Sequence, residues 1–239
     1  FVHDLIPTTH PEYSRPGAKE KHELRMLSMI SDACGLIANS QYTVDEALKF
    51  ADSRSLSCPP IMVSWLASNF VPALDLQNHN SEKAPHSKFP YFVMLSTIEP
   101  RKNHLLLLQV WRKIVEEYGV NSSPKLVIVG QRGWECEQVI DLLERCEALR
   151  NVVIEKNNCT DIELQALLKD ARALLFPSFV EGFGMPLVEA LLFKTPVIAS
   201  DIPVFREVGQ NIPDLIDETD GVEWKRVIME YTQDDSNLR

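Results

Sequence analysis

The 239-residue sequence has no apolar run as long as a membrane-spanning helix and no excess of basic residues. The longest apolar candidate, LLLLQVWRKIV, carries Arg112 and Lys113 and falls short of the roughly 20 residues that cross a bilayer. The 24 Lys and Arg residues against 34 Asp and Glu residues give a formal net charge of −10. A phosphate backbone needs a broad basic face, so we expect no nucleic-acid partner. Peripheral association with a membrane stays compatible with this composition.

Paired cysteine motifs are also absent. The five cysteines are odd in number and none has CxxC spacing, which indicates reduced thiols in a cytoplasmic protein instead of a disulfide framework or a zinc knuckle. The six histidines form no HxH or Hx3H cluster, and no Asp-x-Asp triplet occurs, so we expect no metal site. The sequence also lacks a Gly-x-Ser-x-Gly elbow and a Gly-x4-Gly-Lys-Ser/Thr loop, which argues against hydrolase and P-loop chemistry.

From residue 91 onward, short apolar runs alternate with amphipathic stretches, which predicts alternating strands and helices. The 45% apolar content is enough for a hydrophobic core. Strands such as KLVIVG and ALLFP show no polar alternation, which is typical of a parallel sheet covered by helices on both faces. The fold class predicted is therefore a doubly wound α/β sheet. We expect strands at 91–96, 125–130, 151–155, 173–177, 195–200 and 214–216, and helices at 103–118, 134–147, 161–170, from about 184, at 203–207 and at 220–232.

The first 66 residues repeat this rhythm on a shorter scale. We expect strands at 1–6, 35–39 and 60–65 and helices at about 19–33 and 43–51. The polar, proline-containing stretch LQNHNSEKAPHSKFP reads as a linker, so we predict domains at 1–75 and 76–239. The opening FVHDLIP resembles the end of a buried strand whose partners lie upstream, so we expect the chain to be a fragment that lacks part of its N-terminal domain.

Ligands of open α/β sheets collect at the carboxyl ends of the strands, and by this prediction residues 96–104, 130–134 and 177–184 meet there. The first of these segments contains Arg101 and Lys102 at the start of a helix, where two cations oppose the helix dipole. A diphosphate would relieve them, since a guanidinium, an ammonium and free N–H groups can all bind its oxygens. The alternative is a solvated surface pair.

The third segment contains Glu181, Gly182 and Gly184 ahead of the next helix. Glycines before a helix let a ligand approach the backbone, and the free N–H groups there suit phosphate or sugar oxygens. A simple turn is the alternative explanation for the glycines.

Glu189 is a carboxylate inside an otherwise apolar helix. Burying a carboxylate costs several kcal/mol unless it is hydrogen-bonded, and a sugar diol offers two donors to one carboxylate. The alternative is an ion pair with Arg206 or Arg172.

The motifs EGFGMPLVEA, STIEPRKN and IVGQRGW, in this arrangement along the chain, resemble those of the retaining glycosyltransferases of family 4. The likeness covers most of residues 91–210, and FVHDLIPTTHPE and ANSQYTVDEAL look like the later part of the acceptor-side domain of that family. The resemblance implies the GT-B architecture of two Rossmann-like domains, the second of which binds the nucleotide sugar.

The resemblance also implies roles for single residues. Arg101 and Lys102 would neutralise the donor diphosphate in place of a metal, and Glu189 would hold the ribose hydroxyls. Glu181 would act at the donor sugar, and His3 would face the sugar and the leaving phosphate.

Backbone groups complete the implied donor site. The N–H groups of Phe183 and Gly184, next to Gly182, would bind the sugar and phosphate of the donor. Gly130 lies in the second segment at the ligand edge, and Asn158 belongs to the loop 155–160 that would lie near the nucleotide base.

The implied reaction is transfer of a sugar from a GDP- or UDP-linked donor to a hydroxyl of a saccharide or lipid-linked acceptor, with retention and without a cofactor or metal. Surface polysaccharide or glycolipid synthesis in the cytoplasm, at the inner membrane face, would fit. Glu181 as a covalent nucleophile is an alternative mechanism. Alternative functions are a nucleotide-sugar epimerase of the same architecture and a non-catalytic nucleotide-sugar-binding module. Nothing in the sequence predicts an oligomeric state.

Overall fold

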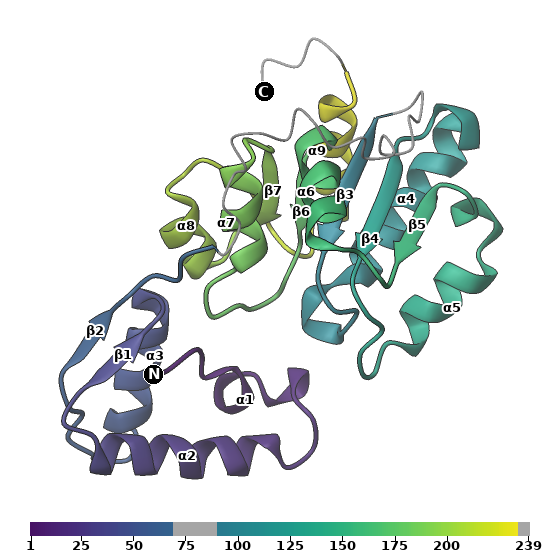
Figure 1. The fold of residues 1–239 in the computed structure, drawn as a ribbon. Helices are drawn as coiled ribbons and strands as arrows, with labels where there is room; N and C mark the ends of the chain where they lie inside the picture. The colour runs from purple at the N-terminus through teal and green to yellow at the C-terminus, as the bar shows by residue number, and fades with distance from the viewer. Residues whose placement is uncertain (69–89, 234–239) are drawn as a thin grey trace. The chain divides into compact units, whose positions relative to one another are not determined.

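The structure, a computed structural model, describes residues 1–68 and 90–233 and divides them into two compact units (Figure 1). One unit comprises Phe1–Ser68, Val180–Met185 and Ile202–Asn211, and the other comprises the rest of the described chain. The predicted domain boundary near residue 76 lies outside the described residues. Two short segments of the C-terminal half therefore belong to the same unit as the N-terminal residues.

The second unit is built on a parallel sheet with the strand order β5-β4-β3-β6-β7-β8, six strands in the described residues. The strands are β3 (Tyr91–Leu95), β4 (Lys125–Val129), β5 (Val153–Lys156), β6 (Leu174–Phe176), β7 (Val197–Ser200) and β8 (Asp214–Ile216). Each strand coincides with a predicted one. The doubly wound parallel sheet predicted from the sequence is confirmed.

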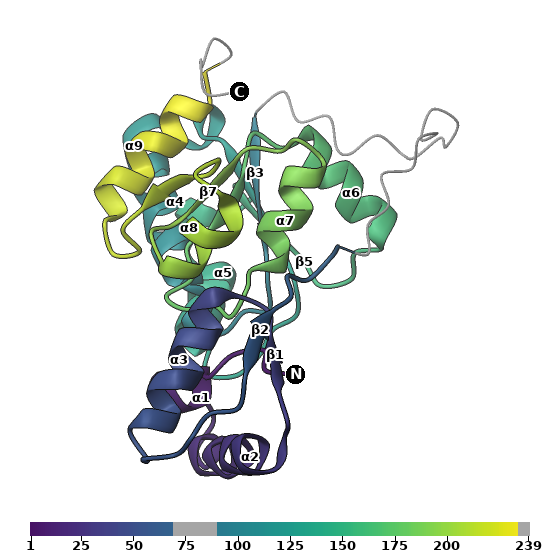
Figure 2. The same ribbon diagram turned by 90° about the vertical axis from the view of Figure 1, so that its left-hand side faces the viewer.

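Helices cover both faces of this sheet, as the edge-on view in Figure 2 shows, with α4, α5 and α9 on one side and α6 and α7 on the other. Their bounds are α4 (His104–Tyr118), α5 (Glu137–Arg145), α6 (Asp161–Asp170), α7 (Met185–Leu192) and α9 (Gly221–Tyr231). Three-residue 3-10 turns lie between the elements: η3 (Pro100–Lys102), η4 (Val120–Ser122) and η5 (Glu147–Leu149). Because helices pack on both faces of the sheet, the side chains on both faces of its strands are apolar.

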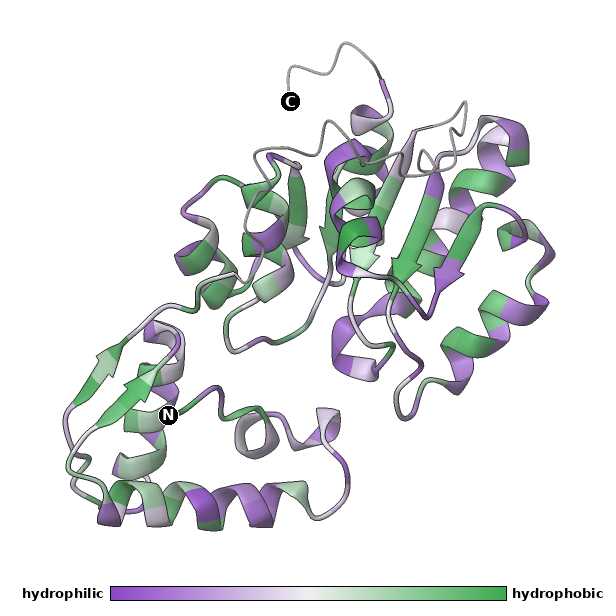
Figure 3. Ribbon diagram, viewed as in Figure 1, coloured by the Kyte–Doolittle hydropathy of each residue, from purple (hydrophilic) through white to green (hydrophobic). Residues whose placement is uncertain are grey.

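The core follows from this arrangement. Figure 3 shows the central strands as almost wholly hydrophobic, and the side chains of β4 beyond Lys125 are buried. The largest core cluster lies between the sheet and the α4, α5 and α9 side, and it contains the fully buried Trp111 and Trp224. Each indole N–H donates to a backbone carbonyl, Trp111 to Pro124 and Trp224 to Asp217, both at 2.9 Å. Both buried polar groups are thus satisfied.

The first unit contains a short parallel pair, β1 (Leu36–Ala38) with β2 (Ile61–Val63), together with helices and a 3-10 turn. The helical elements are α1 (Ile6–Thr9), η1 (Pro11–Tyr13), α2 (Ala18–Asp32), α3 (Gln41–Asp52) and α8 (Pro203–Gly209). The predicted helices at 19–33 and 43–51 and the strands at 35–39 and 60–65 are confirmed.

The predicted strand at 1–6 is wrong. Val2 alone bridges to Ala38, and helix α1 begins at Ile6. The physical reason is local, because the Asp4 carboxylate accepts the Ile6 N–H at 3.0 Å and Pro7 occupies the first turn of the helix.

Candidate functional site

The sheet of the second unit has its topological switch point between β3 and β6. From β3 the chain winds through β4 to β5 on one side, and β6 leads through β7 to β8 on the other. The loops that follow β3 and β6 therefore leave the same sheet edge from neighbouring strands, where open α/β sheets bind their ligands. The three predicted segments, 96–104, 130–134 and 177–184, follow β3, β4 and β6.

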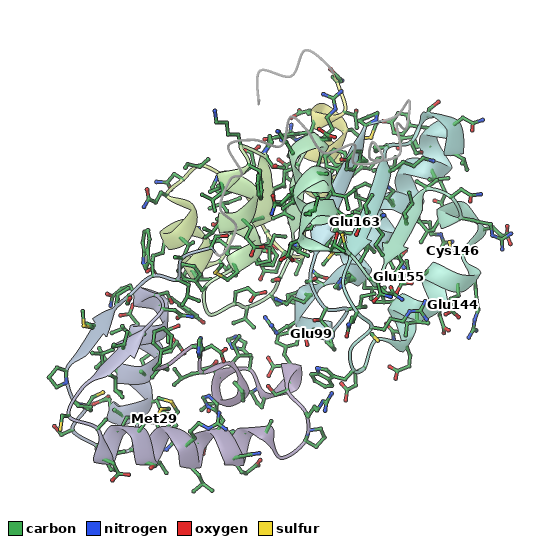
Figure 4. All side chains as sticks on the ribbon, in the orientation of Figure 1. Met29, Glu99, Glu144, Cys146, Glu155 and Glu163 are labelled. Carbon is green, nitrogen blue, oxygen red and sulfur yellow. The ribbon has the colours of Figure 1, made fainter. Side chains whose placement is uncertain are left out.

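The cationic pair Arg101 and Lys102 ends the turn η3, and Asn103 alone separates it from α4. Arg101 Nε lies 2.9 Å from the carboxylate of Glu99, a residue labelled in Figure 4. Lys102 is buried, with its ammonium 5.5 Å from the centre of the Phe176 ring in β6. The pair is therefore not the solvated surface pair considered as the alternative.

The turn η3 is held in place from two directions. The N–H of Phe179, in the loop after β6, donates to the carbonyl of Arg101 at 2.9 Å. Asn103 adopts a left-handed conformation with φ of 58° and donates its side-chain amide to the carbonyl of Glu218 at 2.8 Å. The loops after β3, β6 and β8 are thus joined by hydrogen bonds around the cations.

His104, the first residue of α4, lies near the charge of Lys102, and its ionisation state could not be predicted from the sequence. Burial first, and then the charge of Lys102, lower its pKa to about 3. Its Nε2 lies 3.3 Å from the hydroxyl of Ser96. The ring is therefore neutral at physiological pH and adds no third cation beside Arg101 and Lys102.

Glu189 lies in α7 and is half-buried. Burial, with a further contribution from the negative charge of Asp161, raises its pKa to about 7. Among the residues that the structure describes, no arginine contributes to this shift. Binding of ribose hydroxyls by Glu189 stays a prediction.

Gly130 lies directly after β4, where a Cβ atom would stand 2.0 Å from the carbonyl oxygen of Ser96. Close approach of the β3 and β4 ends thus requires glycine there.

Asn158 is exposed in the loop between β5 and α6. Arg132, in the segment after β4, binds Glu155 at 2.9 Å and Glu144 at 2.6 Å, two carboxylates labelled in Figure 4. These pairs fix the GQRGW segment to β5 and α5.

The other predicted site residues belong to the first unit. The loop 180–185 contains the buried Glu181, Gly182 and Phe183, and Gly184 has a positive φ of 96° that favours glycine. His3 is exposed, and its ring lies 4.7 Å from that of Phe1. The structure thus places the predicted residues in two groups, one in each unit.

Two features are absent from the described residues. No group of three or more His, Cys, Asp or Glu side chains in residues 1–68 and 90–233 is placed to hold a metal ion. In the same ranges, no helix has the length and hydropathy needed to cross a bilayer.

Comparison with known proteins identifies the family. The chain belongs to the glycosyl transferases group 1, whose family model matches residues 77–235. It is 31% identical over 220 residues to the serotype-specific mannosyltransferase WbdA of Escherichia coli, covering 87% of this chain and 26% of that protein. It is 28% identical over 242 residues to the O-antigen chain mannosyltransferase B of the same organism, covering 98% of this chain and 61% of that protein. The chain thus spans about a quarter and about three fifths of these relatives.

A solved structure shows the same fold. A variant of Staphylococcus aureus TarM, in complex with fondaparinux, α-GlcNAc-glycerol and UDP, superposes with a TM-score of 0.69 at 22% identity, covering 95% of this chain and 43% of that one. The fold class predicted from the sequence, α/β of the GT-B type, is confirmed.

Proposed function

We propose that the chain takes part in transferring a mannosyl residue from a nucleotide diphosphate sugar to a hydroxyl of a saccharide or lipid-linked acceptor, with retention and without a metal. Mannosyl transfer is suggested by the names of the two Escherichia coli relatives, and a nucleotide donor by the UDP bound to the TarM variant. Synthesis of a surface polysaccharide at the cytoplasmic membrane face is the proposed setting.

The observation that carries the proposal is the turn η3 at the switch point. Two cations end a turn that the loop after β6 holds through the Phe179 to Arg101 hydrogen bond. A diphosphate leaving group develops negative charge as the bond to the sugar breaks, and fixed cations in a partly buried site stabilise that charge. Arg101 and Lys102 would do so without a divalent ion.

The remaining residues would bind and orient the donor. Glu189 would accept hydrogen bonds from both ribose hydroxyls, while the N–H groups of Phe183 and Gly184 would bind the donor phosphate and sugar. Glu181 and His3 would act at the sugar, Gly130 would line the donor site, and Asn158 would lie near the base.

In the proposed step, the bond between the anomeric carbon and the phosphate oxygen breaks. The acceptor oxygen bonds to the same face of the sugar, and its proton passes to the leaving phosphate. A double displacement through Glu181 is the alternative route, and mass spectrometry would detect its glycosylated intermediate.

Calorimetry with GDP and UDP tests the donor site. Lys102→Ala and Glu189→Ala should each weaken binding of the preferred nucleotide by about tenfold or more, because each removes a charged partner. Lys113→Ala is the matched control, since it removes a lysine from the exposed side of α4. EDTA should leave binding unchanged. Equal affinity in all four proteins would refute the site, and loss of binding with EDTA would refute metal independence.

The reaction is tested separately. Incubation with GDP-mannose and an oligosaccharide acceptor, followed by NMR of the product anomer, should show the donor configuration. Inversion, or release of an epimerised nucleotide sugar, would contradict the proposal.

A further inference from the structure

Gly182, in the loop that the proposed function assigns to the donor, is wedged against the N-terminal segment of its own unit. A Cβ atom at this position would stand 2.3 Å from the carbonyl oxygen of His3 and 2.8 Å from the Cβ atom of Asp4. Contacts under 3.0 Å to backbone are not tolerated. Glycine is therefore required here by the close approach of the His3 backbone, whatever the loop binds.

The Gly182 carbonyl is held by two hydroxyls from the start of α3. Ser40 is fully buried, and its hydroxyl donates to this carbonyl at 2.8 Å, its shortest polar contact. The Thr43 hydroxyl lies 3.4 Å from the carbonyl oxygens of both Gly182 and His3. Ser40 is also the N-cap of α3, since its oxygen accepts the Thr43 N–H at 3.1 Å.

The hydrogen bond from Ser40 to the Gly182 carbonyl also determines the direction of the Phe183 N–H. The peptide group is planar, and no cis peptide bond occurs in the described residues, so the N–H of Phe183 points opposite to the carbonyl of Gly182. With the carbonyl held by Ser40, the Phe183 N–H points away from the start of α3. It donates no hydrogen bond to another residue in the described part of the chain.

A hydrogen bond to the carbonyl also polarises the amide and strengthens the N–H as a donor. We propose that Ser40 is a positioning residue for sugar transfer: by holding the Gly182 carbonyl, it sets the direction of the Phe183 N–H toward the donor and joins the loop 180–185 to the start of α3. This inference rests on the proposed function for the identity of the ligand, but the joint between Ser40 and Gly182 can be tested without any ligand.

Two substitutions separate the positioning role from helix capping. Ser40→Ala and Ser40→Gly both remove the hydroxyl, but glycine is a far better N-cap than alanine. Asp220→Ala is the control, because it removes the N-cap of α9 in the other unit, where Asp220 accepts the Glu223 N–H at 3.0 Å. A role in capping alone predicts a near-normal Ser40→Gly protein.

Hydrogen exchange of the ligand-free chain gives the first readout. Peptides covering 180–185 should exchange about fivefold faster in both Ser40 variants and at the normal rate in Asp220→Ala, as expected for one lost hydrogen bond. The second readout is transfer kinetics, in which the donor KM should rise about five- to tenfold in both Ser40 variants while the acceptor KM stays constant.

The outcomes are distinguishable. Unchanged exchange in the Ser40 variants, or faster exchange with an unchanged donor KM, would overturn the role of Ser40. Normal behaviour of Ser40→Gly would overturn it as well, since it would leave only capping. Absence of nucleotide binding and transfer by the unsubstituted chain would refute the proposed function, and the exchange result would still decide whether Ser40 holds the loop.

Discussion

The raised pKa of Glu189 predicts that nucleotide affinity increases with pH. A carboxylate can accept hydrogen bonds from both ribose hydroxyls, whereas the protonated acid offers fewer acceptors. With the pKa raised by burial to about 7, the ionised fraction rises from about one tenth at pH 6 to about nine tenths at pH 8. Apparent affinity scales with the competent fraction, so Kd should fall about tenfold over this range.

Calorimetry at pH 6, 7 and 8 with Glu189→Gln as the reference measures this effect. The terminal phosphate of a nucleoside diphosphate also loses a proton at about pH 6. The quantity of interest is therefore the ratio of the two Kd values, which cancels the contribution of the ligand. Asp161→Asn should shift the midpoint to lower pH, because the Asp161 charge adds to the rise in the pKa of Glu189. The same pH dependence in the protein and in Glu189→Gln would refute the reasoning.

The raised pKa of Glu189 also makes the stability of the fold depend on pH, and stability should fall as the pH rises, whereas nucleotide affinity should increase. The folded-state pKa of Glu189 lies above the ordinary value of 4.5, so the folded state binds the proton more tightly. The resulting stabilisation is present below about pH 4.5 and is lost as the pH rises through about 7. The difference in pKa corresponds to at most about 3 kcal/mol. Solvent screening of this half-buried group reduces the expected loss to about 1–2 kcal/mol. Urea denaturation of the protein and of Glu189→Gln at pH 5 and pH 8 should show it.

Three further predictions concern stability in urea. Gly130→Ala should destabilise the fold by more than about 2 kcal/mol, because the new Cβ atom would stand 2.0 Å from the carbonyl oxygen of Ser96. Gly119→Ala should cost about 1 kcal/mol, because Gly119 also has a positive φ but its Cβ would meet no atom within 4 Å. Equal costs would contradict the close-approach argument. Ile114→Ala should cost about 2–5 kcal/mol of stability, because the Ile114 side chain is fully buried. Ile162→Ala should cost less than about 0.5 kcal/mol, because Ile162 is 55% exposed. A small loss at Ile114 would contradict its place in the core around α4. Arg132→Ala should cost about 1 kcal/mol or less, because its ion pairs are partly exposed, and a larger loss would show that they act as a network.

The periodicity of the sequence was sufficient to predict the sheet and its helices, because strands buried on both faces leave an unmistakable apolar pattern. The N-terminal strand was mispredicted because Val2, Leu5 and Ile6 are all buried, but in a short helix and its approach. The signal for that helix was present in the sequence as Asp4 two residues before Ile6, followed by Pro7.

The cations and glycines of the candidate site were predictable because they lie in loops after strands. Their supports were not, since they come from distant parts of the chain. Ser40 and Gly182 are 142 positions apart. Glu207 accepts the Gln41 N–H at 2.7 Å across 166 positions, and nothing in either local sequence indicates that contact.

The composition of the first unit has a consequence for protein engineering. Helix α8 is contributed by the C-terminal half, but its Glu207 caps the start of α3 through the N–H groups of Gln41 and Tyr42 and also accepts the indole N–H of Trp65 at 3.2 Å. A chimera that joins this N-terminal region to the C-terminal half of another member of the family would replace Glu207 and the loop around Gly182 together. Successful recombination between relatives should therefore carry these two segments along with the N-terminal region.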